Sequence, residues 1–299
     1  AMRERNNRAV PVLIIAVAAL VGTTAPGRSG DGDAGQQTPE MAEKVFPAKP
    51  HYSPYAGRNF PTRPFFGDTH LHTAMSFDAG MFGARLGPVE AYRFAKGEEV
   101  TSSSGQRARL SRPLDFLVVA DHSDFMGLAP DFLGGKPEVL ADPIARRWFD
   151  LIREGKVGQA FNELLPLYGA GKMPATMQYL PGSPGYRSAW EATIQAAEEA
   201  NAPGRFTAFI GYEWTSNTGG NNLHRNVIFR GNGQQAQLVE PYTTLKPLGS
   251  DNPADLWKWM AMAQEKTGSE LLAIAHNGNL SNGQMFPIVE AFGKKIDAD

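Results

Sequence analysis

Histidine and carboxylate side chains gather at or just beyond the ends of short apolar runs of the sequence. Five of the six histidines lie at such positions: His70, His72, His122, His224 and His276. The acidic residues Asp68, Asp121 and Glu213 occupy comparable positions. Imidazole together with carboxylate is a ligand set that suits divalent zinc, manganese or iron. The chain has no cysteine, so thiolate ligands and a cysteine nucleophile are excluded, and nitrogen and oxygen must hold any metal.

The stretch GDTHLHTAMSFDAG contains the most informative pair of histidines. His70 and His72 are two positions apart in a segment that we predict to be extended. Side chains at such positions of a strand point to the same face, so both imidazoles can reach one cation. Alone, the pair is equally consistent with one surface histidine and one core histidine. The nearby Asp78, together with His122 and Glu213 further along the chain, favours the metal site.

The apolar runs beside these residues predict β-strands, and helical patterns lie between them. The predicted strands are the run at 65–67, Leu114 to Ala120, Phe206 to Tyr212, Asn226 to Arg230 and Leu271 to Ala275. The predicted helices cover 88–96, 142–168 with a break, 185–201 and 252–266. Strands that alternate with helices favour a parallel α/β architecture. Parallel sheets and barrels place functional groups at the carboxyl ends of their strands.

The span from 127 to 204 is longer than a single crossover helix needs. We predict a helical insertion there, lying over the strand ends. The chain length of 299 residues allows one large α/β domain or two small ones. A formal net charge of -2 provides no basic excess that could neutralise phosphates, so a nucleic-acid partner is not expected.

The first residues have the pattern of a targeting segment. Three arginines precede an apolar run at 10–21, and small residues follow it, which predicts a signal peptide over 1–25. The run is shorter than the ~20 residues of a spanning helix, although an uncleaved anchor is the alternative. Residues 26–59 are rich in Gly, Asp, Gln and Pro and predict a flexible linker before a folded domain at 60–299. The mature protein is therefore expected in the periplasm or outside the cell, with no stable membrane span.

Five motifs in order resemble a known family. They are FFGDTHLHTAMSFDAG, LDFLVVADHSDFMG, FIGYEWTS, NNLHRNVIFRG and LLAIAHNGNLSNG, and they run from residue 65 to about residue 283. The chain resembles the DUF3604 family and, more broadly, metallohydrolases of the PHP (polymerase and histidinol phosphatase) type. The resemblance implies a distorted (β/α)7 barrel, similar to a TIM barrel, that holds two or three divalent cations (zinc, manganese or iron).

The resemblance also implies which residues bind each cation. His70 and His72 would bind the first cation, and Glu213 would bridge it to a second cation that His224 and His276 also hold.

Two further pairs of residues carry over from the family pattern. Asp78 and His122 would bind a third cation. Asp68 and Asp121 would orient imidazoles by accepting a ring N–H, and for Asp68 an N-cap or turn role is an equally good interpretation.

The implied reaction is hydrolysis of a phosphoester or a related ester bond by metal-activated hydroxide, acting on a small, anionic substrate. The candidate catalytic residues are Glu213, His224 and Arg225, and Arg225 would hold the substrate anion unless it forms a surface salt bridge instead. Two alternatives stay open. One is a metal-binding or ligand-binding module without catalysis. The other is an amidohydrolase-like barrel, although Glu213 stands where such enzymes usually have a bridging lysine.

One feature departs from the family pattern. PHP-type sites usually finish with an Asp-x-His pair, but no histidine follows His276. We therefore expect this chain to be the N-terminal part of such a domain, with a barrel that is incomplete at its C-terminus.

Overall fold

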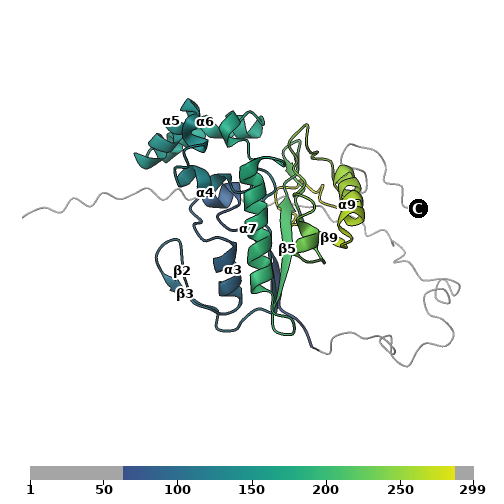
Figure 1. Ribbon diagram of the computed structural model, residues 1–299. Helices are drawn as coiled ribbons and strands as arrows, with labels where there is room; N and C mark the ends of the chain where they lie inside the picture. Colours follow the sequence, from purple (N-terminus) through teal and green to yellow (C-terminus); the bar gives the residue numbers. More distant parts are fainter. Residues whose placement is uncertain (1–62, 287–299) are drawn as a thin grey trace, which may run out of the picture. The chain divides into compact units, whose positions relative to one another are not determined.

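The computed structural model describes residues 63–286, and Figure 1 shows how their helices and strands are arranged. The predicted signal peptide (1–25) and linker (26–59) lie outside the described residues, as do the outermost parts of the predicted domain. Among the residues from 63 to 286, no helix combines the length and the apolar character that crossing a membrane requires.

A mixed five-stranded sheet forms the centre of the fold, with the strand order β1-β4-β5-β8-β9. Its strands are β1 (Gly67–Leu71), β4 (Phe116–Val119), β5 (Thr207–Trp214), β8 (Arg225–Phe229) and β9 (Leu271–Ala275). β1, β4 and β5 are parallel, whereas β8 is antiparallel to both β5 and β9. The expectation of a parallel architecture is therefore wrong for β8. The connection from β5 to β8 is too short for a crossover helix, so it turns the chain back as a hairpin does.

The sheet is curled into a half-barrel. β1 and β9 form its two edges, yet the imidazole ring centroids of His70 and His276 are only 4.9 Å apart. In a flat sheet with a strand spacing of about 4.8 Å, these edges would be separated by about 19 Å. The curl therefore brings the ends of strands that are not neighbours into one place.

The convex face of the sheet carries the main hydrophobic core. Helices α3 (Pro88–Ala95), α7 (Pro184–Ala200) and α9 (Pro253–Thr267) cover this face, and Figure 1 shows α7 alongside β5. Trp190 of α7 packs edge-on against Tyr212, with ring centroids 6.1 Å apart. Since side chains alternate along a strand, Glu213 faces the concave side. A small apolar cluster that contains Val118 and Ile228 lies on that side.

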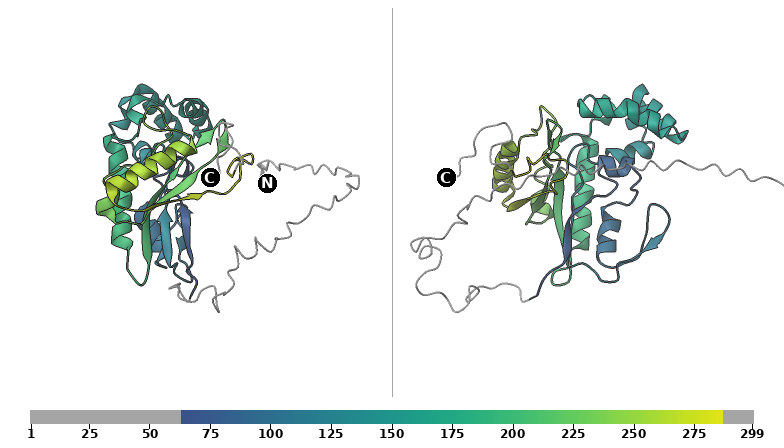
Figure 2. Two further views of the ribbon diagram at one scale, coloured as in Figure 1. Left: turned by 90° about the vertical axis from the view of Figure 1, so that its right-hand side faces the viewer. Right: turned by 180° about the vertical axis from the view of Figure 1, so that it is seen from behind.

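Helices α4 (Leu128–Leu133), α5 (Pro143–Arg153) and α6 (Val157–Gly169) lie toward the end of the sheet at which β5 finishes, as Figures 1 and 2 show. The predicted helical insertion over the strand ends corresponds to these three helices. α7 was included in that prediction, but it packs on β5 as a crossover helix does. The remaining short elements are α2 (Phe77–Met81), β2 (Val100–Thr101), β3 (Arg107–Ala108), β6 (Asn217–Thr218), β7 (Asn221–Asn222), α8 (Gly233–Ala236) and the 3-10 turns Val139–Ala141 and Ala175–Met177.

Gly211 allows the strands beneath Glu213 to approach one another closely. A Cβ at this position would lie 2.6 Å from Val118 Cγ1 on β4 and 2.9 Å from the carbonyl oxygen of Val227 on β8. We expect Gly211→Ala to lower the free energy of unfolding by about 1–3 kcal/mol, because the backbone must move to accommodate the methyl group. Urea denaturation measures this change.

A matched glycine provides the control. A Cβ on Gly158, in α6, would meet no described atom within 4 Å apart from its chain neighbours and the backbone of its own helix. Gly158→Ala is therefore expected to be neutral or to stabilise by up to about 1 kcal/mol. Equal stabilities for the two variants would contradict the close strand packing.

Candidate metal centre

A single buried carboxylate lies at the centre of the site. Glu213 is near the end of β5, its side chain is 1% exposed, and neither carboxylate oxygen has a hydrogen-bond partner among residues 63–286. A buried charge without partners is costly, so such oxygens call for a compensating cation.

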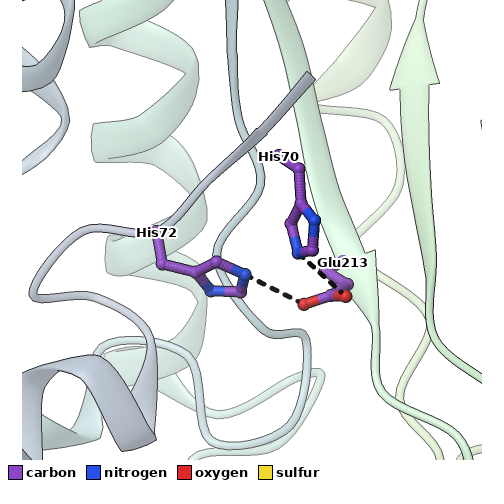
Figure 3. A group of neighbouring side chains, drawn as sticks. All are labelled: His70, His72 and Glu213. Atoms are coloured by element: carbon purple, nitrogen blue, oxygen red, sulfur yellow. Dashed lines mark ion pairs between the residues drawn. The ribbon is translucent and has the colours of Figure 1, made fainter. Parts of the chain in front are cut away.

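Five imidazole rings surround this carboxylate, and Figure 3 shows two of them. The nearest nitrogen of each ring lies 3.0–3.7 Å from an oxygen of Glu213. The five nitrogens are His72 Nε2 at 3.0 Å, His122 Nδ1 at 3.1 Å, His70 Nε2 at 3.2 Å, His224 Nδ1 at 3.3 Å and His276 Nε2 at 3.7 Å. The nitrogens are close to the oxygens but do not have hydrogen-bond geometry. The predicted histidines therefore do come together around Glu213.

The strand order explains this convergence. His70 belongs to β1, and His72 follows this strand. His122 follows β4, and its backbone forms an isolated parallel β-bridge with that of Glu213. His224 precedes its strand rather than following it. Because β8 is antiparallel, its amino end lies at the edge where the other strands finish, and the backbone N–H of His276 donates to the carbonyl of His224 at 3.1 Å.

Asp78 extends the site on one side. It lies in the first turn of α2, and its Oδ2 is 3.4 Å from His122 Nε2. Burial alone would raise the pKa of Asp78, but the nearby imidazole of His122 and its charge outweigh burial and lower this pKa to about 2. Asp78 is therefore an ionised ligand candidate.

Three groups of side chains bring their potential ligand atoms within 4.8 Å of one another: His70, His72 and Glu213; His72, Asp78 and His122; and His122, Glu213 and His224. The groups share members, as a centre for adjacent cations would. The family resemblance pairs His224 with His276, whereas these groups place His224 with His122. His276 reaches only the edge of the cluster, at 3.7 Å from Glu213.

The charges of the site suit a metal. Burial alone would raise the pKa of Glu213, but the imidazoles of His224, His70 and His72 outweigh it and hold this pKa far below its usual range. Burial lowers the pKa of His224, so its ring is neutral. Contact with Glu213 raises the pKa of His70. Metal binding requires an ionised carboxylate and neutral imidazoles, and it therefore displaces protons from rings such as that of His70.

Three of the rings, those of His72, His224 and His276, have a partner on the nitrogen that does not face Glu213. His276 Nδ1 lies 2.7 Å from the carbonyl oxygen of Asn277, which can only accept a hydrogen bond, so a neutral ring directs a bare Nε2 at Glu213. His72 Nδ1 contacts the hydroxyl group of Ser76. His122 contacts the hydroxyl group of Thr215 through Nδ1, the nitrogen that also lies 3.1 Å from Glu213. His224 Nε2 lies 3.3 Å from the side-chain nitrogen of Asn217. Rotating that amide by 180° would place its oxygen there instead and leave His224 Nδ1 bare.

Neither Asp68 nor Asp121 accepts a ring N–H within the described part of the chain. Asp68 Oδ1 accepts from the backbone N–H of His70 at 2.8 Å, which is the turn role that the sequence left open. Asp121 is fully buried and accepts from the backbone N–H and the hydroxyl of Thr73, both at 2.6 Å. Asp121 thus fixes the backbone directly after His72.

Arg225 does not lie in the cluster. It pairs with Trp214 across the ladder, so it projects from the face opposite to Glu213. Its guanidinium donates to the carbonyls of Leu223 and Met285 and lies 5.6 Å from the ring of Trp257. The predicted role of Arg225 in holding a substrate anion therefore has no support in these contacts, and its salt-bridge alternative has no carboxylate partner among residues 63–286.

Asn226 is a site residue that the sequence did not single out. It pairs directly with Glu213 across the ladder, so its side chain shares the concave face. Asn226 is 2% exposed, and its Oδ1 has no hydrogen-bond partner in the described region. The sequence signal for this residue was an asparagine inside an otherwise apolar run. The face of the sheet on which its side chain lies depends on the direction of β8.

These residues fit a divalent cation. The donor atoms are imidazole nitrogens and carboxylate oxygens, which suit zinc, manganese or iron. The buried oxygens of Glu213 and the buried Nδ1 of His224 lack hydrogen-bond partners in the described chain, and a shared cation would satisfy all three atoms. The buried His/Glu clusters can therefore hold a metal ion.

Comparison with known proteins yields one family. The model of DUF3604, described as "Protein of unknown function (DUF3604)", matches residues 59–299. The matched span contains every residue of the cluster. Searches of curated proteins and of solved structures each return no match.

Proposed function

Since the chain belongs to the DUF3604 family, whose description assigns no activity, we propose a function from the geometry of the cluster: metal-dependent hydrolysis of phosphoester or related ester bonds. The observation that carries this proposal is Glu213, a buried carboxylate without hydrogen-bond partners in the described chain and with five imidazoles around it. Hydrolases that act through metal ions need such a preorganised set of oxygen and nitrogen ligands.

We assign the ligand roles by proximity. His70, His72 and Glu213 would hold one cation, and His122, Glu213 and His224 would hold a neighbouring cation. The carboxylate of Asp78 and the imidazole of His276 would complete the set. When bound, divalent cations would polarise a phosphoryl or carbonyl oxygen and lower the pKa of water.

The residues of the chain favour an anionic substrate. Two divalent cations against the carboxylates of Glu213 and Asp78 would leave the centre with a net positive charge, which attracts anions. His70 and His72 keep 30% and 22% of their side chains exposed, whereas Glu213 is buried. A substrate would therefore approach from the side of these two histidines, and the buried amide of Asn226 would lie beneath it.

We also propose that the half-barrel belongs to a PHP-like (β/α)7 barrel within the predicted domain at 60–299. The curled sheet, the helices on its convex face and the histidines at one end of the strands support this assignment. Export through a signal peptide at 1–25, and hence a periplasmic or secreted location, is proposed from the sequence pattern. Amino-terminal sequencing of the exported protein tests it.

The test of hydrolysis compares two chromogenic substrates. The 299-residue chain, loaded with zinc or manganese, is assayed with para-nitrophenyl phosphate and para-nitrophenyl acetate. We expect hydrolysis of at least one ester that stops when a chelator removes the metal and returns when the metal is restored. Turnover that persists without metal would contradict the proposal. Bound metal without turnover of either ester would instead identify a non-catalytic metal-binding module.

A further inference from the structure

Two buried hydroxyl groups each contact one histidine of the cluster from behind. Ser76 Oγ lies 2.6 Å from His72 Nδ1, and Thr215 Oγ1 lies 3.0 Å from His122 Nδ1. Both hydroxyl residues are buried. The far nitrogens of the same rings face carboxylates, His72 Nε2 at 3.0 Å from Glu213 and His122 Nε2 at 3.4 Å from Asp78.

The direction of each hydroxyl hydrogen bond decides what the far nitrogen can do. A neutral imidazole carries one proton. If the hydroxyl accepts from Nδ1–H, then Nε2 is bare and can bind a cation. If the hydroxyl donates to Nδ1, then Nε2 carries the proton and can only donate to the carboxylate.

The surroundings of Thr215 determine this direction. Its Oγ1 lies 3.1 Å from the backbone carbonyl oxygen of Glu213, which can only accept. The hydroxyl hydrogen of Thr215 is therefore committed to that carbonyl, and its oxygen accepts from His122 Nδ1–H.

The hydrogen bonds of Ser76 fit either direction. Its oxygen accepts from the backbone N–H of His122 at 2.9 Å, which uses one of its two lone pairs. The other lone pair can accept from His72 Nδ1–H, and the hydroxyl can equally donate to a bare Nδ1. Of these two hydroxyl groups, only that of Thr215 therefore fixes the tautomer of its histidine.

On the basis of the proposed metal centre, we infer that Thr215 is a positioning residue: it holds the neutral ring of His122 as the Nδ1–H tautomer, so that a bare Nε2 faces Asp78. His276 has the same tautomer because of the Asn277 carbonyl. A bare nitrogen beside an ionised carboxylate is an arrangement that a cation between them stabilises.

The affinity test uses a hydroxyl-free variant of the 299-residue chain. We expect Thr215→Val to weaken zinc binding roughly 10–100-fold in a competition titration against a zinc-binding dye. Ser123→Ala is the matched control, because Ser123 is equally buried and next to His122, but its hydroxyl has no partner among the described residues. Thr215→Ser retains the hydroxyl and is expected to restore the affinity.

A second measurement reads the tautomers directly. In ¹⁵N-histidine NMR spectra of the protein without zinc, recorded above the raised pKa of His122, the neutral ring of His122 is expected as the Nδ1–H tautomer, and Thr215→Val is expected to shift it toward Nε2–H. Wild-type protein that binds zinc while Thr215→Val binds it equally well would overturn the inference alone. So would an Nε2–H tautomer of His122 in the wild type. Protein that binds no zinc but has the Nδ1–H tautomer would refute the metal centre and leave the inference standing. If Thr215→Val does not fold, the tautomer of His122 in the wild type decides.

Discussion

Replacing Glu213 with glutamine is expected to abolish tight metal binding and to lower turnover by about 10³-fold or more. This loss is at the upper end of the effects seen when an enzyme loses a group that stabilises charge at the reacting centre. Glutamine has nearly the same shape but no negative charge. The five surrounding imidazoles are neutral ligands and do not offset the positive charge of a bound cation. Glutamine cannot offset it either, whereas the carboxylate of Glu213 can. The zinc content after gel filtration and the rate of hydrolysis of para-nitrophenyl phosphate measure the two effects.

The matched control for this variant is Glu270→Gln. Glu270 is 73% exposed and pairs with Arg230 at the surface, where ion pairs contribute little to stability. Its replacement is expected to leave zinc content and turnover unchanged. A Glu213→Gln protein that retains zinc as the wild type does would refute the bridging role of Glu213.

Removal of the metal is expected to lower the melting temperature of the wild-type protein by about 8–16 °C. Zinc at 1,000 times its dissociation constant stabilises the folded state by about 4 kcal/mol, and in a domain of this size 1 kcal/mol corresponds to about 2–4 °C. The buried carboxylate of Glu213 also loses its compensating charge when the cation leaves. Differential scanning calorimetry of zinc-loaded and chelator-dialysed protein measures the shift.

The Glu213→Gln variant again serves as the control, because a protein without the site should melt at the same temperature with and without zinc. If the variant responds to zinc as the wild type does, the stabilising ion binds elsewhere. An unchanged melting temperature in the wild type would mean that the cluster holds no tightly bound zinc.

Local signals in the sequence predicted most elements. The strand expected at Leu271 to Ala275 has these bounds in the structure, and the helix expected from Asn252 is α9. Asn252 caps that helix by accepting from the backbone N–H of Ala254, and Gly268 ends it with a φ of 65°. Such signals act within a few residues, so the sequence contains them fully.

Strand direction and side-chain face could not be predicted in the same way. The direction of β8 depends on how the short connection after β5 pairs with its neighbours, which no local pattern specifies. This direction decides that Asn226, not Arg225, shares the face of Glu213. The expectation for Arg225 stays a prediction without support in its contacts, because a position beside a site residue in a strand projects to the opposite face.

The histidines that meet around Glu213 were predictable, whereas the groups that hold them were not. Types and positions at strand ends single out His70, His72 and His122 even without a structure. Ser76 and Thr215 lie close to them only after folding, and a serine or threonine near a strand end has no distinctive pattern. Tertiary contacts therefore carry the part of the site that the sequence leaves open.

The most direct test of the metal centre is the metal content of the protein. The 299-residue chain is incubated with zinc, passed through gel filtration and measured by inductively coupled plasma mass spectrometry, with Glu213→Gln treated in parallel. We predict at least one zinc ion per wild-type chain and none in the variant. Wild-type protein that emerges without zinc, or a variant with as much zinc as the wild type, would contradict a metal centre built around Glu213.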